Sequence, residues 1–123
     1  MLTRKTRIGT SFHSWAEETS EYALDLNEFL IQHKSATFFI RVDGDGMIDA
    51  GIHSEDILIV DRALSISHDR LIVARLDGEL VVKRIHINGQ QLYLVSNTHE
   101  PIFIAPDRDF EIWGVVTYVI HRT

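Results

Sequence analysis

Two turn dipeptides, Asp77-Gly78 and Asn88-Gly89, constrain the fold of this chain more than any other feature of its sequence. They separate three runs of strand-forming residues at 71–76, 79–87 and 91–96. Asp-Gly and Asn-Gly supply the positive φ angles that tight hairpins require. The pattern therefore predicts an antiparallel meander of three strands.

Further strands are predicted on both sides of this meander. The β-branched and aromatic runs at 37–42 and 57–60 precede it, and a short run at 102–104 follows it between Pro101 and Pro106. The last run, 110–121, is long and rich in Val, Ile, Tyr and Trp, with Gly114 at the position of a possible bulge. We expect this last strand to be buried on both faces, since apolar residues occupy both of its alternating rows. Either the core covers both faces, or the core covers one face and a second subunit covers the other.

A short helix is predicted over residues 25–33. Apolar residues and His33 follow one another there at spacings of three and four, and Asp25 can cap the helix start. Residues 1–24 mix charged residues, Ser and Thr with scattered aromatics, which predicts a flexible N-terminal arm. The expected protein is mostly β, with an arm at 1–24 and one folded domain at 25–123.

Composition excludes several functions. The formal charge of -6 opposes direct binding to a phosphate backbone, so DNA contact is expected mainly through partners. The chain has no cysteine, which excludes disulfides, thiolate metal sites and a cysteine nucleophile. No apolar run reaches the ~18 residues of a membrane span, and no signal-peptide core is present, so a cytoplasmic protein that does not bind membranes is expected.

No metal site or cofactor is predicted. The seven histidines are scattered along the chain and lack the close spacings that are typical of zinc sites. Asp43, Asp45 and Asp49 lack the twelve-residue loop with a terminal Glu that calcium binding would require. Phosphate-binding and dinucleotide-binding fingerprints are absent as well.

The segment 43–49 contains two glycines two residues apart between predicted strands. Such a segment can form a simple β-turn, or a loop whose N–H groups point at a reacting atom.

Lys83 lies in the second strand of the meander. Because side chains alternate across a strand, it falls on the same face as Val81, Ile85 and Ile87. Burial among aliphatic groups would lower the pKa of the amine, and a neutral lysine can act as general base for a serine hydroxyl. Alternatively, the side chain of Lys83 extends along its neighbours to reach water at a strand edge.

Taken together, these segments resemble the S24 peptidase-like domains of LexA repressors and UmuD mutagenesis proteins. Members carry a serine-lysine dyad, with the serine in a Gly-Asp-Ser-Met loop and the lysine on a strand after an Asp-Gly-Glu turn. Here Gly44-Asp45-Gly46-Met47 stands at the loop, and Asp77-Gly78-Glu79 precedes Lys83. The resemblance runs from about Leu24 through the last strand and is closer to UmuD than to LexA. It extends to Asp25-Leu26-Asn27, Leu30-Ile31-Gln32-His33, Leu58-Ile59-Val60-Asp61 and Gly114-Val115-Val116.

At the site positions that the resemblance implies, this chain departs from the family pattern. Gly46 takes the position of the nucleophilic serine, Met47 follows it in the oxyanion loop, and Lys83 takes the position of the general base. Members cut their own arm at a Cys-Gly or Ala-Gly dipeptide, whereas Thr10 and Ser11 stand at that position here. Glycine has no side chain that could attack a peptide bond, so both the nucleophile and its substrate are altered.

The resemblance also implies a function and partners. The shortened form of UmuD is a homodimer that binds a UmuC-like Y-family polymerase and a RecA filament, and so supports error-prone copying of damaged DNA in the SOS response. This chain is expected to act as such an accessory subunit, without autocleavage. Two alternatives stay open: a self-cleaving serine-lysine peptidase whose nucleophile was replaced by Gly46, or a decoy that dimerises with an active relative.

Overall fold

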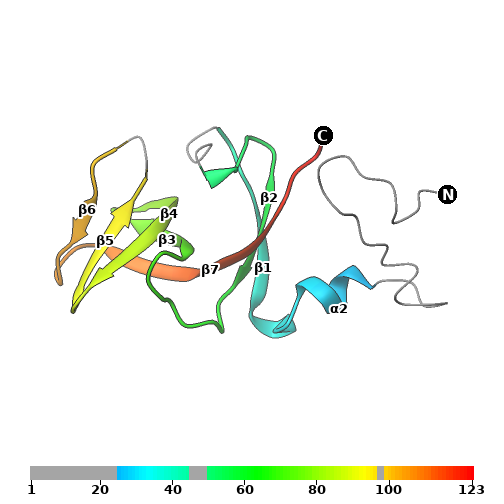
Figure 1. Ribbon diagram of the computed structural model, residues 1–123, viewed down its shortest axis with the longest axis horizontal. Coiled ribbons are helices and arrows are strands. Elements are labelled where there is room, and N and C mark those ends of the chain that lie inside the picture. The colour runs from blue at the N-terminus through cyan, green and yellow to red at the C-terminus, as the bar shows by residue number, and fades with distance from the viewer. Residues whose placement is uncertain (1–24, 45–49, 97–98) are drawn as a thin grey trace, which may run out of the picture. The chain divides into compact units, whose positions relative to one another are not determined.

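One antiparallel sheet organises the described part of the chain. The computed structural model describes residues 25–44, 50–96 and 99–123, and the chain divides into two units, 1–32 and 33–123. The second unit holds a seven-stranded sheet with the order β1-β2-β7-β3-β4-β5-β6, in which every neighbouring pair is antiparallel (Figure 1). The strands are β1 (Thr37–Arg41), β2 (Ile57–Asp61), β3 (Leu71–Leu76), β4 (Glu79–Asn88), β5 (Gln91–Val95), β6 (Ile102–Ile104) and β7 (Phe110–Ile120). The prediction of a mostly β fold of antiparallel strands with one short helix is confirmed.

The predicted helix is present but shorter than expected. In the first unit, α2 (Leu26–Leu30) begins at Asp25, whose carboxylate accepts a hydrogen bond from the Asn27 N–H at 3.0 Å. The helix ends where Ile31 takes extended backbone angles. The predicted extension to His33 is wrong, because His33 instead precedes a separate 3-10 helix, η1 (Lys34–Ala36), which leads into β1.

The two predicted hairpins differ in their turns. In the first, Leu76 pairs with Glu79, and both loop residues, Asp77 and Gly78, have positive φ as predicted. In the second, Asn88 itself pairs with Gln91, so the loop is formed by residues 89 and 90, and only the first of these, Gly89, has positive φ. The second loop is therefore shifted by one residue from the Asn-Gly dipeptide.

Two hydrophobic cores lie on opposite faces of strands β3 and β7. Val73 and Val116 contribute to one core, whereas their neighbours Ile72 and Val115 contribute to the other. Adjacent residues of a strand point to opposite faces, so the same two strands serve both cores. The first core is completed by Ile52, Leu58 and Val60, and the second by Ala74, Ile85, Leu94 and Ile104.

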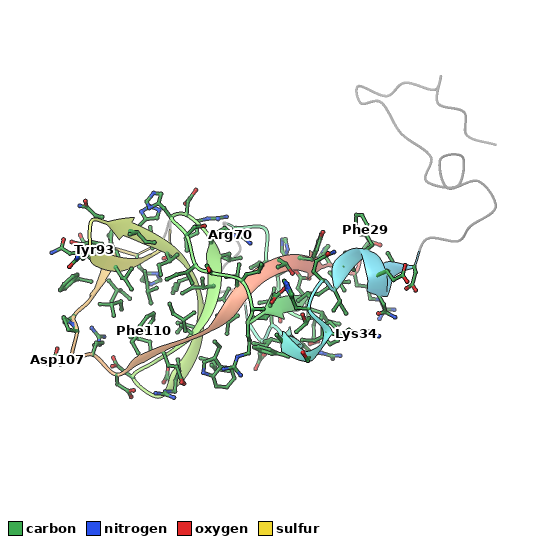
Figure 2. All side chains as sticks on the ribbon, turned by 90° about the horizontal axis from the view of Figure 1, so that it is seen from below. Phe29, Lys34, Arg70, Tyr93, Asp107 and Phe110 are labelled. Carbon is green, nitrogen blue, oxygen red and sulfur yellow. The ribbon has the colours of Figure 1, made fainter. Side chains whose placement is uncertain are left out.

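The sheet ends at β6, on the far side from β1. There Tyr93 of β5 is labelled in Figure 2. Its ring lies beside that of Phe103 of β6, with ring centroids 5.4 Å apart. Phe103 is exposed, as are Phe39 on the opposite edge strand β1 and Ile120 at the end of β7. Both edges of the sheet therefore carry apolar side chains in water.

The long strand β7 is irregular at two places. Its pairing with β3 shifts between Gly114 and Ile112, and its pairing with β2 shifts between Tyr118 and Val116. The first irregularity lies directly beside Gly114, where a bulge was predicted. Gly114 and the two residues that follow are buried, but Tyr118 and Ile120 are exposed, so the core of the single chain does not cover both faces along the whole strand.

Candidate functional site

Lys83 lies on β4 opposite Ile72 of β3 and is partly exposed. Its row on β4 matches the prediction: Val81 and Ile87 are partly buried, and Ile85 is fully buried. The lysine is thus set among aliphatic neighbours, but its own side chain is not enclosed by them. Partial exposure agrees with the alternative in which the stem packs on neighbouring side chains while the amine reaches water.

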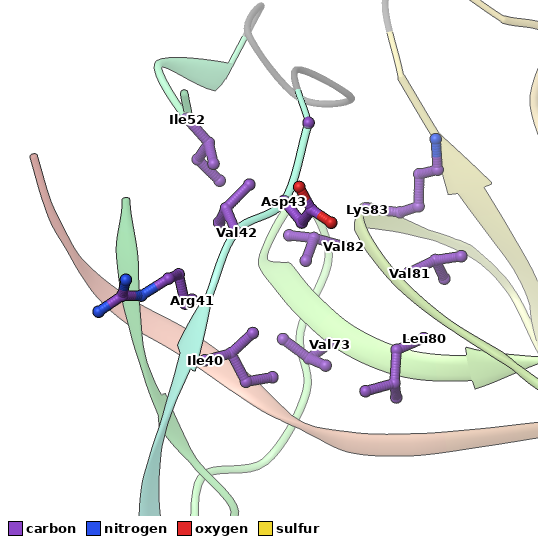
Figure 3. Close-up of a pocket in the computed structure, with 11 residues that line it drawn as sticks. Ile40, Arg41, Val42, Asp43, Ile52, Val73, Leu80, Val81, Val82 and Lys83 are labelled. Carbon is purple, nitrogen blue, oxygen red and sulfur yellow. The ribbon is translucent and has the colours of Figure 1, made fainter. Parts of the chain in front are cut away.

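A cavity of about 410 Å³ opens between the end of β1 and the start of β4. Asp43 and Lys83 come from its opposite sides, while the floor is aliphatic (Figure 3). Gly44 also lines this cavity, and in the sequence it directly precedes the segment 45–49. The remaining lining residues are Ile40, Arg41, Val42, Ile52, Val73, Leu80, Val81 and Val82.

This cavity, called the groove below, combines aliphatic walls with a few polar groups. Its lining is mostly aliphatic, with polar groups concentrated at Arg41, Asp43 and Lys83. Ligand sites commonly combine an apolar wall with a few polar groups that fix orientation.

The other site positions predicted from the sequence lie outside the described residues. Gly46 and Met47 fall in the segment 45–49, and Thr10 and Ser11 fall in the segment 1–24. Their predicted roles as nucleophile position, oxyanion loop and cleavage position therefore stay predictions. Of the five, Lys83 is the one whose surroundings the structure describes.

Sequence reasoning missed Ser96. A second cavity, of about 320 Å³, is lined by Lys83 together with Ser96, His99 and Glu100. The Ser96 hydroxyl is buried without a hydrogen-bond partner among the described residues. Since Arg84 pairs with Val95, continuing the register of this hairpin sets Ser96 opposite Lys83. The hairpin register was the signal that could have found it.

Two buried carboxylates bracket β2, each with a histidine partner. Asp56 lies just before the strand and Asp61 ends it, and they are 1% and 3% exposed. His121 Nδ1 lies 2.6 Å from Asp56 Oδ1, and His33 Nδ1 lies 2.6 Å from Asp61 Oδ2.

Both carboxyls have a pKa below the ordinary value. For Asp56 the main cause is the hydrogen bond from the His53 backbone N–H, which together with His121 outweighs the opposing effect of burial on the pKa. For Asp61 burial alone would raise the pKa, but hydrogen bonds from His33 and the Ala63 N–H lower it by more. Both groups are therefore carboxylates at neutral pH.

Comparisons with known proteins assign this antiparallel β domain to a family. The family model described as Peptidase S24-like matches residues 4–117. Protein MucA of Salmonella typhimurium is 40% identical over 114 residues, which cover 91% of this chain and 78% of MucA. Protein ImpA of the same species is 41% identical over 118 residues, covering 95% of this chain and 81% of ImpA.

A repressor is also similar over a shorter stretch. LexA repressor 2 of Pseudomonas syringae pv. tomato is 39% identical over 87 residues, which cover 69% of this chain and 43% of the repressor. The chain therefore belongs to the peptidase S24-like family, as a UmuD-like member. This is a family of serine peptidases, which confirms the resemblance found in the sequence.

Proposed function

We propose that this chain is a UmuD-like accessory subunit of an error-prone translesion DNA polymerase that does not cleave itself. The proposal rests on the predicted match of Gly46 to the position of the family's serine and of Lys83 to that of its lysine. The observation that supports it is that Lys83 lines a cavity whose wall continues to Gly44, two residues before Gly46. With glycine at the nucleophile position, that loop offers Lys83 no hydroxyl to deprotonate, so the family's dyad reaction cannot start there. What remains is a folded domain with a groove and apolar edges.

The groove and the edges suit binding rather than catalysis. The apolar cavity beside Lys83 can hold an extended segment, such as an arm, without cutting it. Exposed Phe39 and Ile120 offer apolar surface for a second copy of the chain. The partners proposed are therefore a homodimer mate, a UmuC-like Y-family polymerase and a RecA filament in the cytoplasm, with DNA contacted mainly through them.

The part of the chain that the structure describes holds no helix that is long and apolar enough to cross a membrane. The net charge of -6 also favours contact with DNA through basic partners over direct contact.

The decisive experiment measures binding and cleavage together. We expect the purified chain to bind the Y-family polymerase encoded beside its gene and to increase bypass of a lesion on a primed template. After incubation with RecA filaments, mass spectrometry should find the intact polypeptide. An end mapped near Thr10 in the unaltered chain, or the absence of any effect on the polymerase, would overturn the proposal.

The alternative of a peptidase with a replaced nucleophile is tested by Gly46→Ser. If only the nucleophile were missing, this substitution would restore cutting of the arm at alkaline pH, and Gly46→Ser with Lys83→Ala would abolish it again. We expect no cutting by Gly46→Ser, because the arm has Thr10-Ser11 where the family has Cys-Gly or Ala-Gly. The decoy alternative predicts co-purification with an active relative, whereas strict self-association argues against it.

A further inference from the structure

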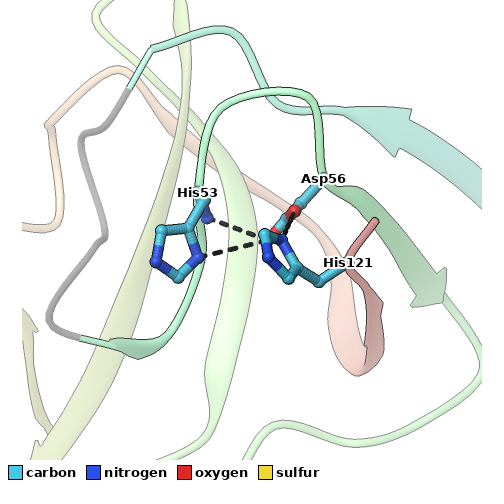
Figure 4. A group of neighbouring side chains, drawn as sticks. All are labelled: His53, Asp56 and His121. Atoms are coloured by element: carbon cyan, nitrogen blue, oxygen red, sulfur yellow. Dashed lines mark hydrogen bonds and ion pairs between the residues drawn. The ribbon is translucent and has the colours of Figure 1, made fainter. Parts of the chain in front are cut away.

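Three side chains from two segments that are far apart in the sequence meet near the start of β2 and the end of β7. His53 and Asp56 precede β2, and His121 follows β7 (Figure 4). Each offers a ligand atom, and these atoms all lie within 4.8 Å of one another. We propose that His53, Asp56 and His121 form a binding site for a divalent transition-metal ion, and that Zn²⁺ matches it best.

The side chain of Asp56 is held in one orientation at this site. Its side chain is 1% exposed, and its Oδ2 accepts a hydrogen bond from the His53 backbone N–H at 2.8 Å. A carboxylate held by such a hydrogen bond keeps one orientation, which is what an outer-shell contact does for a metal ligand. A buried carboxylate also needs positive charge beside it, and a divalent cation supplies that charge.

The two imidazole rings can rotate, because both are partly exposed. The His121 and His53 side chains are 48% and 44% exposed, and their ring centroids lie 4.8 Å apart. Nδ1 of His121 already lies 2.6 Å from Asp56, whereas Nδ1 of His53 lies 3.8 Å from it. Ligand atoms around a tetrahedral ion with bonds of about 2.0–2.1 Å are separated by about 3.3 Å, so a small rotation of the exposed rings brings the set to that size.

An unsatisfied nitrogen supports the site independently. Nδ1 of His53 is buried and has no hydrogen-bond partner among the described residues. Burying a polar atom without a partner costs free energy, so such an atom needs an explanation. A metal ion between the three side chains would accept the lone pair of this nitrogen.

The ligand set selects the class of ion. Two imidazoles and one carboxylate suit Zn²⁺ and its transition-metal neighbours, whereas Mg²⁺ and Ca²⁺ require mainly oxygen ligands. Three protein ligands leave the fourth tetrahedral position for water, which reaches the site past the half-exposed rings. An ion here would join the segment before β2 to the chain after β7, next to Ile52 of the cavity wall.

Calorimetric titration of the full-length, chelator-treated protein with ZnCl₂, and in parallel with MgCl₂, tests the proposal. We expect one Zn²⁺ per chain, no saturable Mg²⁺ binding, and a melting temperature that rises with free Zn²⁺. His53→Gln and His121→Gln should each weaken Zn²⁺ binding at least tenfold. His86→Gln is the matched control: its ring lies 4.7 Å from that of His68 and its Nε2 lies 3.3 Å from Asp69, but this group does not bring three ligand atoms together.

The proposed site would be ruled out if His53→Gln and His121→Gln bound Zn²⁺ with an affinity within twofold of that of the unaltered protein. Binding of less than half an equivalent of Zn²⁺ per chain would also rule it out. Melting curves recorded in chelator check that each variant is folded. Should His121→Gln unfold because it loses the contact with Asp56, His53→Gln alone decides the question, since its Nδ1 makes no hydrogen bond among the described residues.

Discussion

At Gly114 the backbone of β7 lies so close to β2 that a side chain does not fit between them. A Cβ atom there would lie 2.7 Å from Val60 Cγ1 and 3.1 Å from the Asp61 carbonyl oxygen. Gly114→Ala should therefore lower the free energy of unfolding by about 1–3 kcal/mol, a usual cost of overpacking, as measured by urea denaturation.

A double-mutant cycle separates this contact from other effects of the substitution. Val60→Ala removes Cγ1, so Val60→Ala with Gly114→Ala should destabilise less than the sum of the two single changes. Strict additivity would contradict the contact as the cause.

Asp61 makes the stability of the protein depend on pH. Its folded-state pKa is below the unfolded value of about 3.9, so its contribution to stability is fully present above that pH and is lost as the pH falls through the folded pKa. We expect the unfolding free energy to fall as the pH is lowered from about 5 to 2, and Asp61→Asn to flatten that fall.

The same series of urea titrations separates the partners of Asp61. His33→Gln removes a hydrogen bond that lowers the pKa of Asp61, so it should also flatten the fall, by less than Asp61→Asn. Gln90→Ala, an uncharged change in an exposed turn, should keep the full slope. A slope that Asp61→Asn leaves unchanged would show that other carboxyls determine the dependence.

At the scale of elements, the turn of the second hairpin requires a positive φ at residue 89, and the effect of that requirement on stability can be measured. Gly89 has φ of 63°, and nothing lies within 4 Å of a Cβ built there, so backbone conformation alone opposes a side chain. Gly89→Ala should destabilise the protein by about 1 kcal/mol, whereas Gly89→Asn should cost much less, because Asn tolerates this region. Thermal melts of both variants make the comparison, and equal losses would argue against it.

The strands could be predicted from the sequence because each depends on a local pattern. The runs at 71–76 and 102–104 have the observed bounds of β3 and β6, and the other strands differ by one residue at their ends. The turn after Asn88 was placed one residue early, since residue type alone does not fix which pair closes a hairpin. In β7 the pairing shifts between Tyr118 and Val116, so the two alternating rows expected from the sequence do not keep to one face each along the whole strand.

The candidate site was predictable in part for the same reason. The alternation along β4 placed Lys83 correctly among aliphatic neighbours. The position of Ser96 opposite Lys83 follows only from the register of β4 and β5. The proximity of His53 and His121 follows only from the arrangement of the whole sheet. Side chains that meet through pairing between distant strands leave no spacing pattern in a single sequence.

At the scale of the whole molecule, the exposed apolar side chains bear on self-association. Phe39 pairs in register with Ile59, which pairs in turn with Tyr118, so the exposed Phe39 and Tyr118 flank the same buried residue. Such a row on a sheet face suits the isologous contact of a two-fold dimer. We propose that this face carries the homodimer.

Light scattering at tens of micromolar, an order-of-magnitude choice for a stable homodimer, tests this assignment. We expect the unaltered chain to have twice the mass of one chain, and Phe39→Glu to shift it toward monomer. Phe103→Glu, an equally drastic change on the other edge strand, should leave the dimer intact. A monomeric unaltered chain, or a dimer insensitive to Phe39→Glu, would remove this interface.

The position of β7 has a consequence for how the protein is made. It is the last strand of the described sequence, yet it lies between β2 and β3 in the sheet and supplies both cores. While a ribosome still covers residues 110–120, the nascent polypeptide has only two separate ladders, β1 with β2 and β3 through β6. Folding of this sheet is therefore completed only after residues 110–120 have left the ribosome, and until then two unpaired strand edges stay open to chaperones.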